Sequence, residues 1–153
     1  MMKTLSPDIQ NLTDKLKVAE EIYEKASSRV HNRPMRDQLK LISKKKEEYL
    51  TELSVDMGTN LNTRNINLSE RIHLELEKAE IEISHLLIRR NENDILSFCI
   101  QREQELVQSY LNGVIEAQKS NEKISILLRQ LEETKRLLEE LKETKKAYEF
   151  NEP

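Results

Sequence analysis

Apolar residues recur along most of this chain at alternating steps of three and four, which is the spacing of one face of an α-helix. Five such stripes follow one another, from Ile9 to Val30, Met35 to Leu53, Leu68 to Leu86, Leu96 to Gly113 and Ile124 to Tyr148. No stretch alternates apolar and polar residues as a half-buried strand does. The pattern predicts an all-α protein, with helices at about 7–31, 34–57, 68–90, 94–118 and 121–149.

Short polar segments mark the ends of these helices. Asn32 or Arg33 begins the second helix, and Asn93 caps the fourth. No proline or strong glycine signal separates the last two helices, so one helix from Asn93 to Phe150, about 85 Å long, is an alternative. We expect a break near Ser120, because the other amphipathic helices need partners.

The third predicted helix has apolar residues on two sides. Besides its main stripe it carries Leu74, Ile81 and Ile88 at intervals of seven, which predicts contacts with neighbours on two faces. It follows a polar, aperiodic loop at residues 58–67 and lies between two pairs of long helices. We therefore expect residues 1–153 to form one domain, a ferritin-like up-down four-helix bundle with an additional crossover helix between the two pairs.

Composition and charge narrow the classes of function. The chain has 153 residues, and its 25 basic and 28 acidic residues give a formal net charge of −3. This balance argues against nucleic-acid binding, and no stretch approaches the length of a membrane span. Cys99 is the only cysteine, so no disulfide forms within the chain and a reducing compartment is favoured. We expect a cytoplasmic protein without a cofactor.

Two charged residues interrupt the apolar stripes, Lys46 in the second and Glu103 in the fourth. By stripe position they lie at one mid-bundle level with Ala19 and Thr134. Burying either charge alone costs several kcal/mol, and an ion pair with Thr134 or Tyr110 as hydrogen-bond partner recovers much of that. We predict a polar core layer of Lys46, Glu103, Thr134 and Tyr110. Two alternatives for Glu103 stay open: a metal ligand, or a surface-edge residue through a shift in register.

A ferritin-type di-iron centre needs a carboxylate from each of two helices and a Glu-x-x-His string from each of two others. Two such strings occur, Glu70 to His73 and Glu82 to His85, but both belong to the third helix. They are separated by about 18 Å along the helix axis, so they cannot chelate one centre. The histidines that a di-iron site requires on the other helices are absent.

Two short motifs occur in the chain, a Tyr-x-x-Ala at Tyr23 to Ala26 and a Cys-x-x-x-Glu at Cys99 to Glu103, which is followed by Tyr110. They belong to three longer segments, AEEIYEKASSRVHNRPMRDQLKLISKKKEEYLTEL, LSERIHLELEKAEIEISHLLIRRNENDILSFCIQREQELVQSYLNGVI and RQLEETKRLLEELK. In order and spacing they resemble a family of small bacterial ferritin-like bundle proteins of uncharacterised function. The resemblance implies a fold and a bacterial origin, not a reaction. Where that family has a glycine-containing acidic turn before the first tyrosine, this chain has VAEEI, which puts an acidic function there in doubt.

No catalytic template is complete. The chain lacks a glycine-rich phosphate loop and a Ser/His/Asp arrangement, and the apolar neighbours of Cys99 predict a packed thiol. We expect a non-enzymatic structural or protein-interaction bundle, stress-associated by the resemblance, with a degenerate ferritin-like metal site. The alternative is a protein that binds iron or manganese at a non-standard carboxylate site of Glu47, Glu103 and Glu133.

The fifth predicted helix also indicates a partner. Its residues Leu127, Leu131, Leu138 and Leu141 resemble the seam of a coiled coil. If these leucines exceed what the other helices cover, we expect a homodimer or a complex with another helical protein.

Overall fold

The computed structural model describes residues 7–57, 70–88, 92–119 and 124–151 of the chain. They form α1 (Pro7–Arg29), α2 (Arg33–Met57), α3 (Glu70–Ile88), α4 (Glu92–Lys119) and α5 (Ser125–Asn151), with no strand among the described residues. The predicted all-α class is confirmed, and α4 and α5 are separate helices as predicted. The predicted loop at 58–67 lies outside the described residues. None of the helices in the described ranges is long and apolar enough to cross a membrane.

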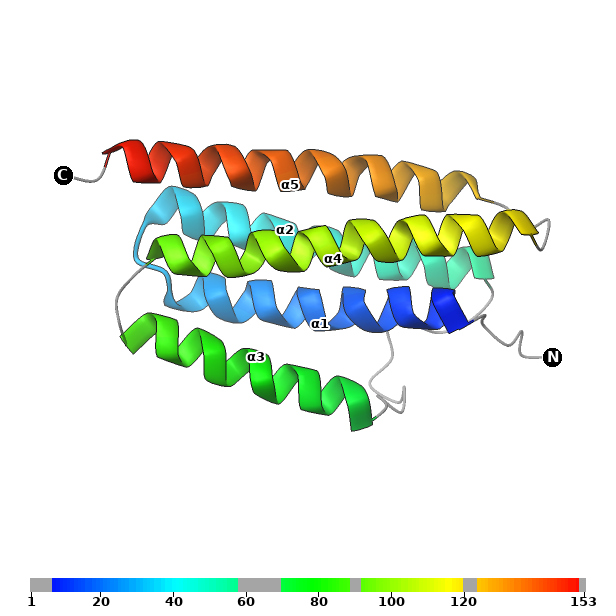
Figure 1. The fold of residues 1–153 in the computed structure, drawn as a ribbon, viewed down its shortest axis with the longest axis horizontal. Coiled ribbons are helices and arrows are strands. Elements are labelled where there is room, and N and C mark those ends of the chain that lie inside the picture. The colour runs from blue at the N-terminus through cyan, green and yellow to red at the C-terminus, as the bar shows by residue number, and fades with distance from the viewer. Residues whose placement is uncertain (1–6, 58–69, 89–91, 120–123, 152–153) are drawn as a thin grey trace.

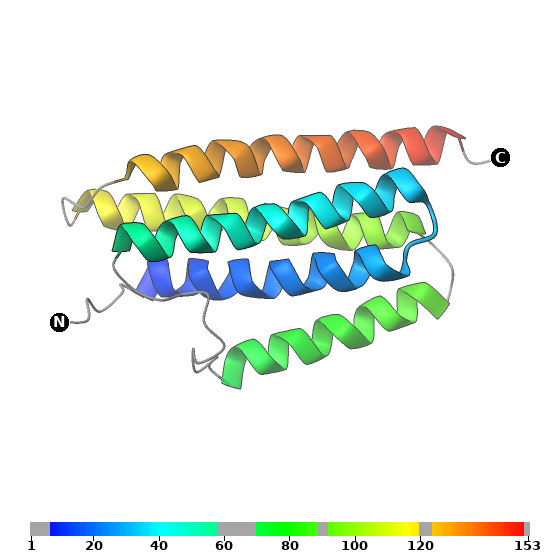
Figure 2. The same ribbon diagram turned by 180° about the vertical axis from the view of Figure 1, so that it is seen from behind.

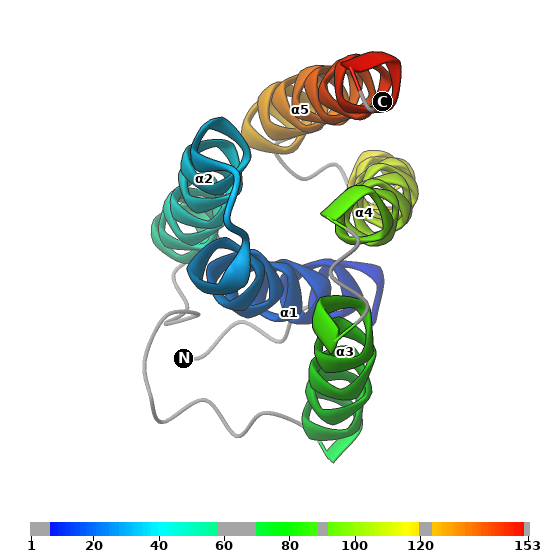
Figure 3. The same ribbon diagram turned by 90° about the vertical axis from the view of Figure 1, so that its left-hand side faces the viewer.

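Four of the helices surround a common core. Seen end on, they form a ring in which α1 lies beside α2, α2 beside α5, α5 beside α4, and α4 beside α1 (Figure 3). Each runs antiparallel to both neighbours in the ring (Figure 1). α3 lies outside the ring against α1 and α4, and leads the chain back so that α4 begins at the end where α2 begins (Figure 2).

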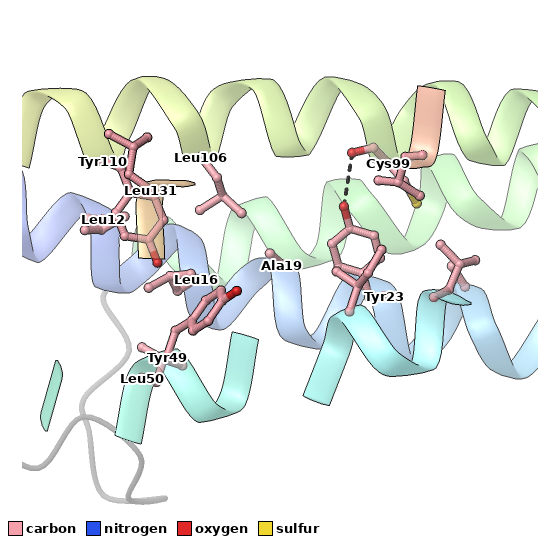
Figure 4. Close-up of a cluster of buried hydrophobic side chains, with 14 of the residues drawn as sticks. Leu12, Leu16, Ala19, Tyr23, Tyr49, Leu50, Cys99, Leu106, Tyr110 and Leu131 are labelled. Carbon is pink, nitrogen blue, oxygen red and sulfur yellow. Dashed lines mark hydrogen bonds between the residues drawn. The ribbon is translucent and has the colours of Figure 1, made fainter. Parts of the chain in front are cut away.

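Buried side chains from all four ring helices form the main hydrophobic cluster. Leu12 and Leu16 of α1, Leu50 of α2, Leu106 of α4 and Leu131 of α5 are among its members (Figure 4). A second cluster joins α3 to the ring and consists of Val18, Ile22, Ala79, Ile83 and Phe98. Burying one such aliphatic or aromatic side chain contributes about 1.5–3 kcal/mol, so these clusters hold the helices together.

Side chains fix the turn between α1 and α2. The Met35 N–H donates to Asn32 Oδ1 at 3.0 Å, so Asn32 is the N-cap of α2. The N–H groups of His31 and Asn32 donate to Glu92 Oε1 at 2.6 and 3.2 Å. Glu92 thereby ties the first residues of α4 to this turn, which sets the level at which α4 faces α1 and α2.

The prediction that α3 contacts neighbours on two faces is wrong. Ala79 and Ile83 are buried, but Leu74 and Ile81 are 56% and 60% exposed. Because α3 lies outside the ring, its described contacts are with α1 and α4 alone. Ile88, the third residue of the predicted second stripe, has no described side chain.

The leucines of α5 that indicated a partner are covered within the chain. Leu127, Leu131, Leu138 and Leu141 are all buried, and they face the core of the ring. This stripe therefore offers no apolar surface to a second molecule.

Candidate functional site

The two charged residues of the apolar stripes meet in the middle of the ring. Lys46 Nζ lies 2.9 Å from Glu103 Oε2, and both side chains are 0% exposed. α2 and α4 are diagonal to one another in the ring (Figure 3), so the pair reaches across the core. The predicted ion pair is present, and the alternative that places Glu103 at the surface edge is wrong.

Tyr23 of α1 satisfies the other oxygen of the Glu103 carboxylate. Its hydroxyl lies 2.8 Å from Glu103 Oε1 and 3.3 Å from the Cys99 carbonyl oxygen, the contact drawn in Figure 4. The Tyr23 side chain is fully buried. Both oxygens of this buried carboxylate therefore have a hydrogen-bond partner, one an ammonium and the other a phenol, and a buried ion pair needs such partners to be stable.

The predicted partners Thr134 and Tyr110 are buried in the same core but bind elsewhere. The Tyr110 hydroxyl donates to Gln130 Oε1 at 2.8 Å, and Gln130 Nε2 donates to the Tyr49 carbonyl at 3.2 Å. Thr134 Oγ1 donates to the Gln130 carbonyl at 2.7 Å. Tyr110 lies about 10 Å from Glu103 along α4, and a helical Thr bonds readily to the carbonyl four residues earlier. The polar layer therefore has two parts, and the expectation that Thr134 or Tyr110 bonds to Glu103 is wrong.

Tyr49 connects the two parts. Its ring centroid lies 5.4 Å from Lys46 Nζ, a cation–π contact that adds to the stabilisation of the ammonium. Its carbonyl accepts from Gln130 on α5. Burial, followed by the nearby Glu133 carboxylate, raises the pKa of the Tyr49 hydroxyl well above its usual range.

The electrostatics of the layer keep its other weak acids protonated. Burial raises the pKa of Tyr23 and of Tyr110, and the charge of Glu103 raises both further. Burial, followed by the Glu103 charge, also raises the pKa of the Cys99 thiol. A thiol that holds its proton is a poor nucleophile and a poor metal ligand, so Cys99 is a packing residue here.

The alternative metal ligands are not brought together. Glu103 is buried, whereas Glu47 is exposed on α2, and Glu133 is half-buried with its carboxylate 3.7 Å from Arg129. Within the described ranges no group of three or more His, Cys, Asp or Glu side chains could hold a metal ion.

The described Glu and His side chains of the two Glu-x-x-His strings of α3 lie at the surface. His73 and His85 are exposed, and the Glu82 carboxylate lies 3.9 Å from the Arg102 guanidinium. The side chain of Glu70 lies outside the described residues.

Sequence reasoning missed Tyr23 and Gln130 as members of the layer. Tyr23 sits in the apolar stripe of α1 one turn after Ala19, and its hydroxyl was the available signal, because a buried tyrosine usually finds a polar partner. Gln130 precedes Leu131 and lies four residues before Thr134. Nothing in the stripe pattern distinguishes this glutamine from a surface residue.

Comparisons with protein-family models, with curated proteins and with solved structures found no match to this chain. The resemblance to ferritin-like bundle proteins therefore stays a prediction.

Proposed function

We propose that this protein is a non-enzymatic helical bundle of ferritin-like type, in which α3 is the crossover and an ion pair stands where such bundles hold metal. The arrangement of the helices supports the topology: α1 pairs with α2, α4 pairs with α5, and α3 runs outside between the pairs. The role that fits this architecture is that of a structural or protein-interaction module.

The observation that carries the proposal is the position of the Lys46 ammonium, 2.9 Å from the Glu103 carboxylate in a fully buried site. A di-iron centre requires several carboxylates and histidines at one level of the bundle. Among the described residues, Glu103 is the one carboxylate buried in this layer, and its two oxygens are engaged by Lys46 and Tyr23. An ammonium at this position repels a divalent cation, so the donor set does not fit a metal.

Non-enzymatic function is supported by the state of the reactive groups. The Cys99 thiol is buried and its pKa is raised, and His73 and His85 are exposed on α3. The hydroxyls of Ser27, Ser43 and Thr134 donate to backbone carbonyls, not to a general base that would activate them.

Metal analysis after incubation with iron or manganese tests the proposal. The purified protein is expected to retain no stoichiometric metal after gel filtration, and its thermal unfolding midpoint is expected to be unchanged by either ion. Glu103→Gln is the matched variant, because it keeps the size of the side chain and removes its charge. Metal retained by the wild type and lost from Glu103→Gln would replace the proposal with the metal-binding alternative.

A further inference from the structure

The outer side of the α1–α2 pair carries a groove of about 720 Å³. It lies away from α4 and α5, which cover the opposite side of these helices (Figure 3). Ser27 of α1 and Ser43 of α2 line it, and Ser43 Oγ donates to the Glu20 carbonyl at 2.8 Å. The groove is therefore formed over a stretch where small side chains let the two helices approach closely.

The two walls of the groove differ in net charge. The α1 wall carries Glu20 and Glu24, four residues apart, whereas the α2 wall carries three basic and two acidic residues, which are Arg36, Lys40, Lys44, Asp37 and Glu47. Residues with this spacing lie on one face of a helix, about 6 Å from one another. Because residue 43 lies beside residue 20 and the helices are antiparallel, Lys44 stands level with Glu20 and Lys40 level with Glu24.

These charges are not neutralised across the groove. Glu20 pairs within its own helix, with Lys17 at 3.2 Å, and the described part of the chain gives no ion pair to Glu24, Lys40 or Lys44. Ion pairs bridge other neighbouring helices: α1 to α3, α1 to α4, α3 to α4, and α2 to α5. Within the described part of the chain, no ion pair thus joins Glu20 or Glu24 of the α1 wall to Lys40 or Lys44 of the α2 wall.

We propose that the occupant of this groove is a second copy of the same chain. A two-fold axis that runs along the groove, parallel to α1 and α2, places the α2 wall of one copy over the α1 wall of the other. Each copy then sets Lys40 against Glu24 and Lys44 against Glu20 of its mate, and each pairing occurs twice. Two-fold symmetry needs a self-complementary surface, and the two glutamates of the α1 wall match Lys40 and Lys44 of the α2 wall in spacing with the opposite sign.

An exposed apolar side chain in the same groove supports this mode of docking. Leu41 lines the groove and is 54% exposed in the single chain. In the symmetric complex the α1 wall of the partner copy covers it. The inference specifies the interaction half of the proposed function, because it names the surface and the partner.

Sedimentation velocity over a range of protein concentrations tests the inference. The wild type is expected to form a dimer whose dissociation constant rises with salt, because salt screens the charge rows. The variant K40E/K44E gives both walls a negative net charge, and E20K/E24K gives both walls a positive net charge. Each variant alone is expected to dimerise roughly 100-fold more weakly, since like charges then oppose one another.

An equimolar mixture of the two variants is expected to restore dimerisation, because every wall then meets one of opposite charge. The matched control is K135E/K146E, which changes the net charge by the same amount on exposed positions of α5 and is expected to dimerise like the wild type. Far-ultraviolet circular dichroism checks that all variants are folded.

A wild type that stays monomeric at every concentration would overturn the inference. Reversal variants that dimerise like the wild type, or a mixture no stronger than its components, would overturn it as well. None of these outcomes bears on metal retention, and retained metal would not alter the dimer test. The two proposals therefore fail separately.

Discussion

Two of the lysine–glutamate pairs that join different helices of this protein lie in opposite environments. Lys46 and Glu103 pair in the core with no exposed surface, whereas Lys25 and Glu80 pair between α1 and α3 with side chains 37% and 49% exposed. Water can solvate either charge of the surface pair when the other is removed, so loss of this pair lowers the free energy of unfolding only slightly. The buried pair has no such alternative, and each charge depends on the other. The comparison shows that the exposure of an ion pair to solvent, more than the contact itself, determines how much its loss destabilises the fold.

High pH is expected to have the largest effect, because it acts on the whole buried layer. The pKa values of Tyr23, Tyr49 and Tyr110 are raised in the folded protein, mainly by burial. The unfolded chain releases these protons near pH 10, whereas the folded chain holds them, so stability is complete below about pH 10 and falls as the pH rises further. Tyrosine absorbance and circular dichroism, followed together, are expected to report ionisation of these tyrosines only as the helices unfold. Their ionisation in a fully helical protein would contradict the burial of the layer.

Removal of one buried charge is expected to have the second-largest effect on stability. Lys46→Met keeps a long side chain but leaves the Glu103 carboxylate buried beside Tyr23 alone. We expect the free energy of unfolding to fall by about 3–5 kcal/mol, measured by urea denaturation. Lys15→Met is the control, since Lys15 lies 3.8 Å from Glu105 with part of its side chain in water. Equal losses of unfolding free energy in the two variants would contradict the claim that the buried pair matters more to stability than an exposed one.

The hydrogen bond from Tyr23 is expected to stabilise the fold less than the ion pair does, but more than a hydrogen bond between two uncharged groups. Tyr23→Phe removes a bond to a charged oxygen, for which we expect a loss of about 1.5–3 kcal/mol. Tyr110→Phe removes a bond to the Gln130 amide, for which about 0.5–1.5 kcal/mol is expected. Denaturant titrations of both variants measure these losses. A larger loss for Tyr110→Phe than for Tyr23→Phe would contradict a charged acceptor for the Tyr23 hydroxyl.

The smallest effect is expected at the surface pair. Lys25 lowers the pKa of Glu80 by a hydrogen bond and by its charge, so this pair stabilises the fold above the unfolded pKa of Glu80 and loses that contribution as the pH falls. Lys25→Ala is expected to leave the unfolding midpoint unchanged within error at neutral pH. A clear drop in that midpoint would show that α3 depends on this contact.

The stripes of the sequence predicted the class, the helices and the ion pair, because a three-and-four alternation assigns each residue to a face. Lys46 and Glu103 interrupt their stripes, and only a partner makes such residues stable in a core. The role of Tyr23 could not be predicted, because it depends on the level at which α1 meets α4. That level is fixed by tertiary contacts such as the one between Glu92 and the α1–α2 turn.

The same limit explains the error over α3. Leu74 and Ile81 have the spacing of a second buried stripe, but the spacing does not tell whether a neighbour is present. The groove of α1 and α2 was equally invisible, since Glu24 and Lys40 look like ordinary surface charges until the helices are placed side by side.

The most direct test of the central claim is a double-mutant cycle on the buried pair. Glu103→Ala is measured in the wild type and again in the Lys46→Met background, by urea denaturation at neutral pH. If the two charges depend on one another, Glu103→Ala destabilises the wild type more than the Lys46→Met protein, by roughly 2 kcal/mol. Equal losses in the two backgrounds would mean that the charges act independently, and would contradict an ion pair at the centre of this bundle.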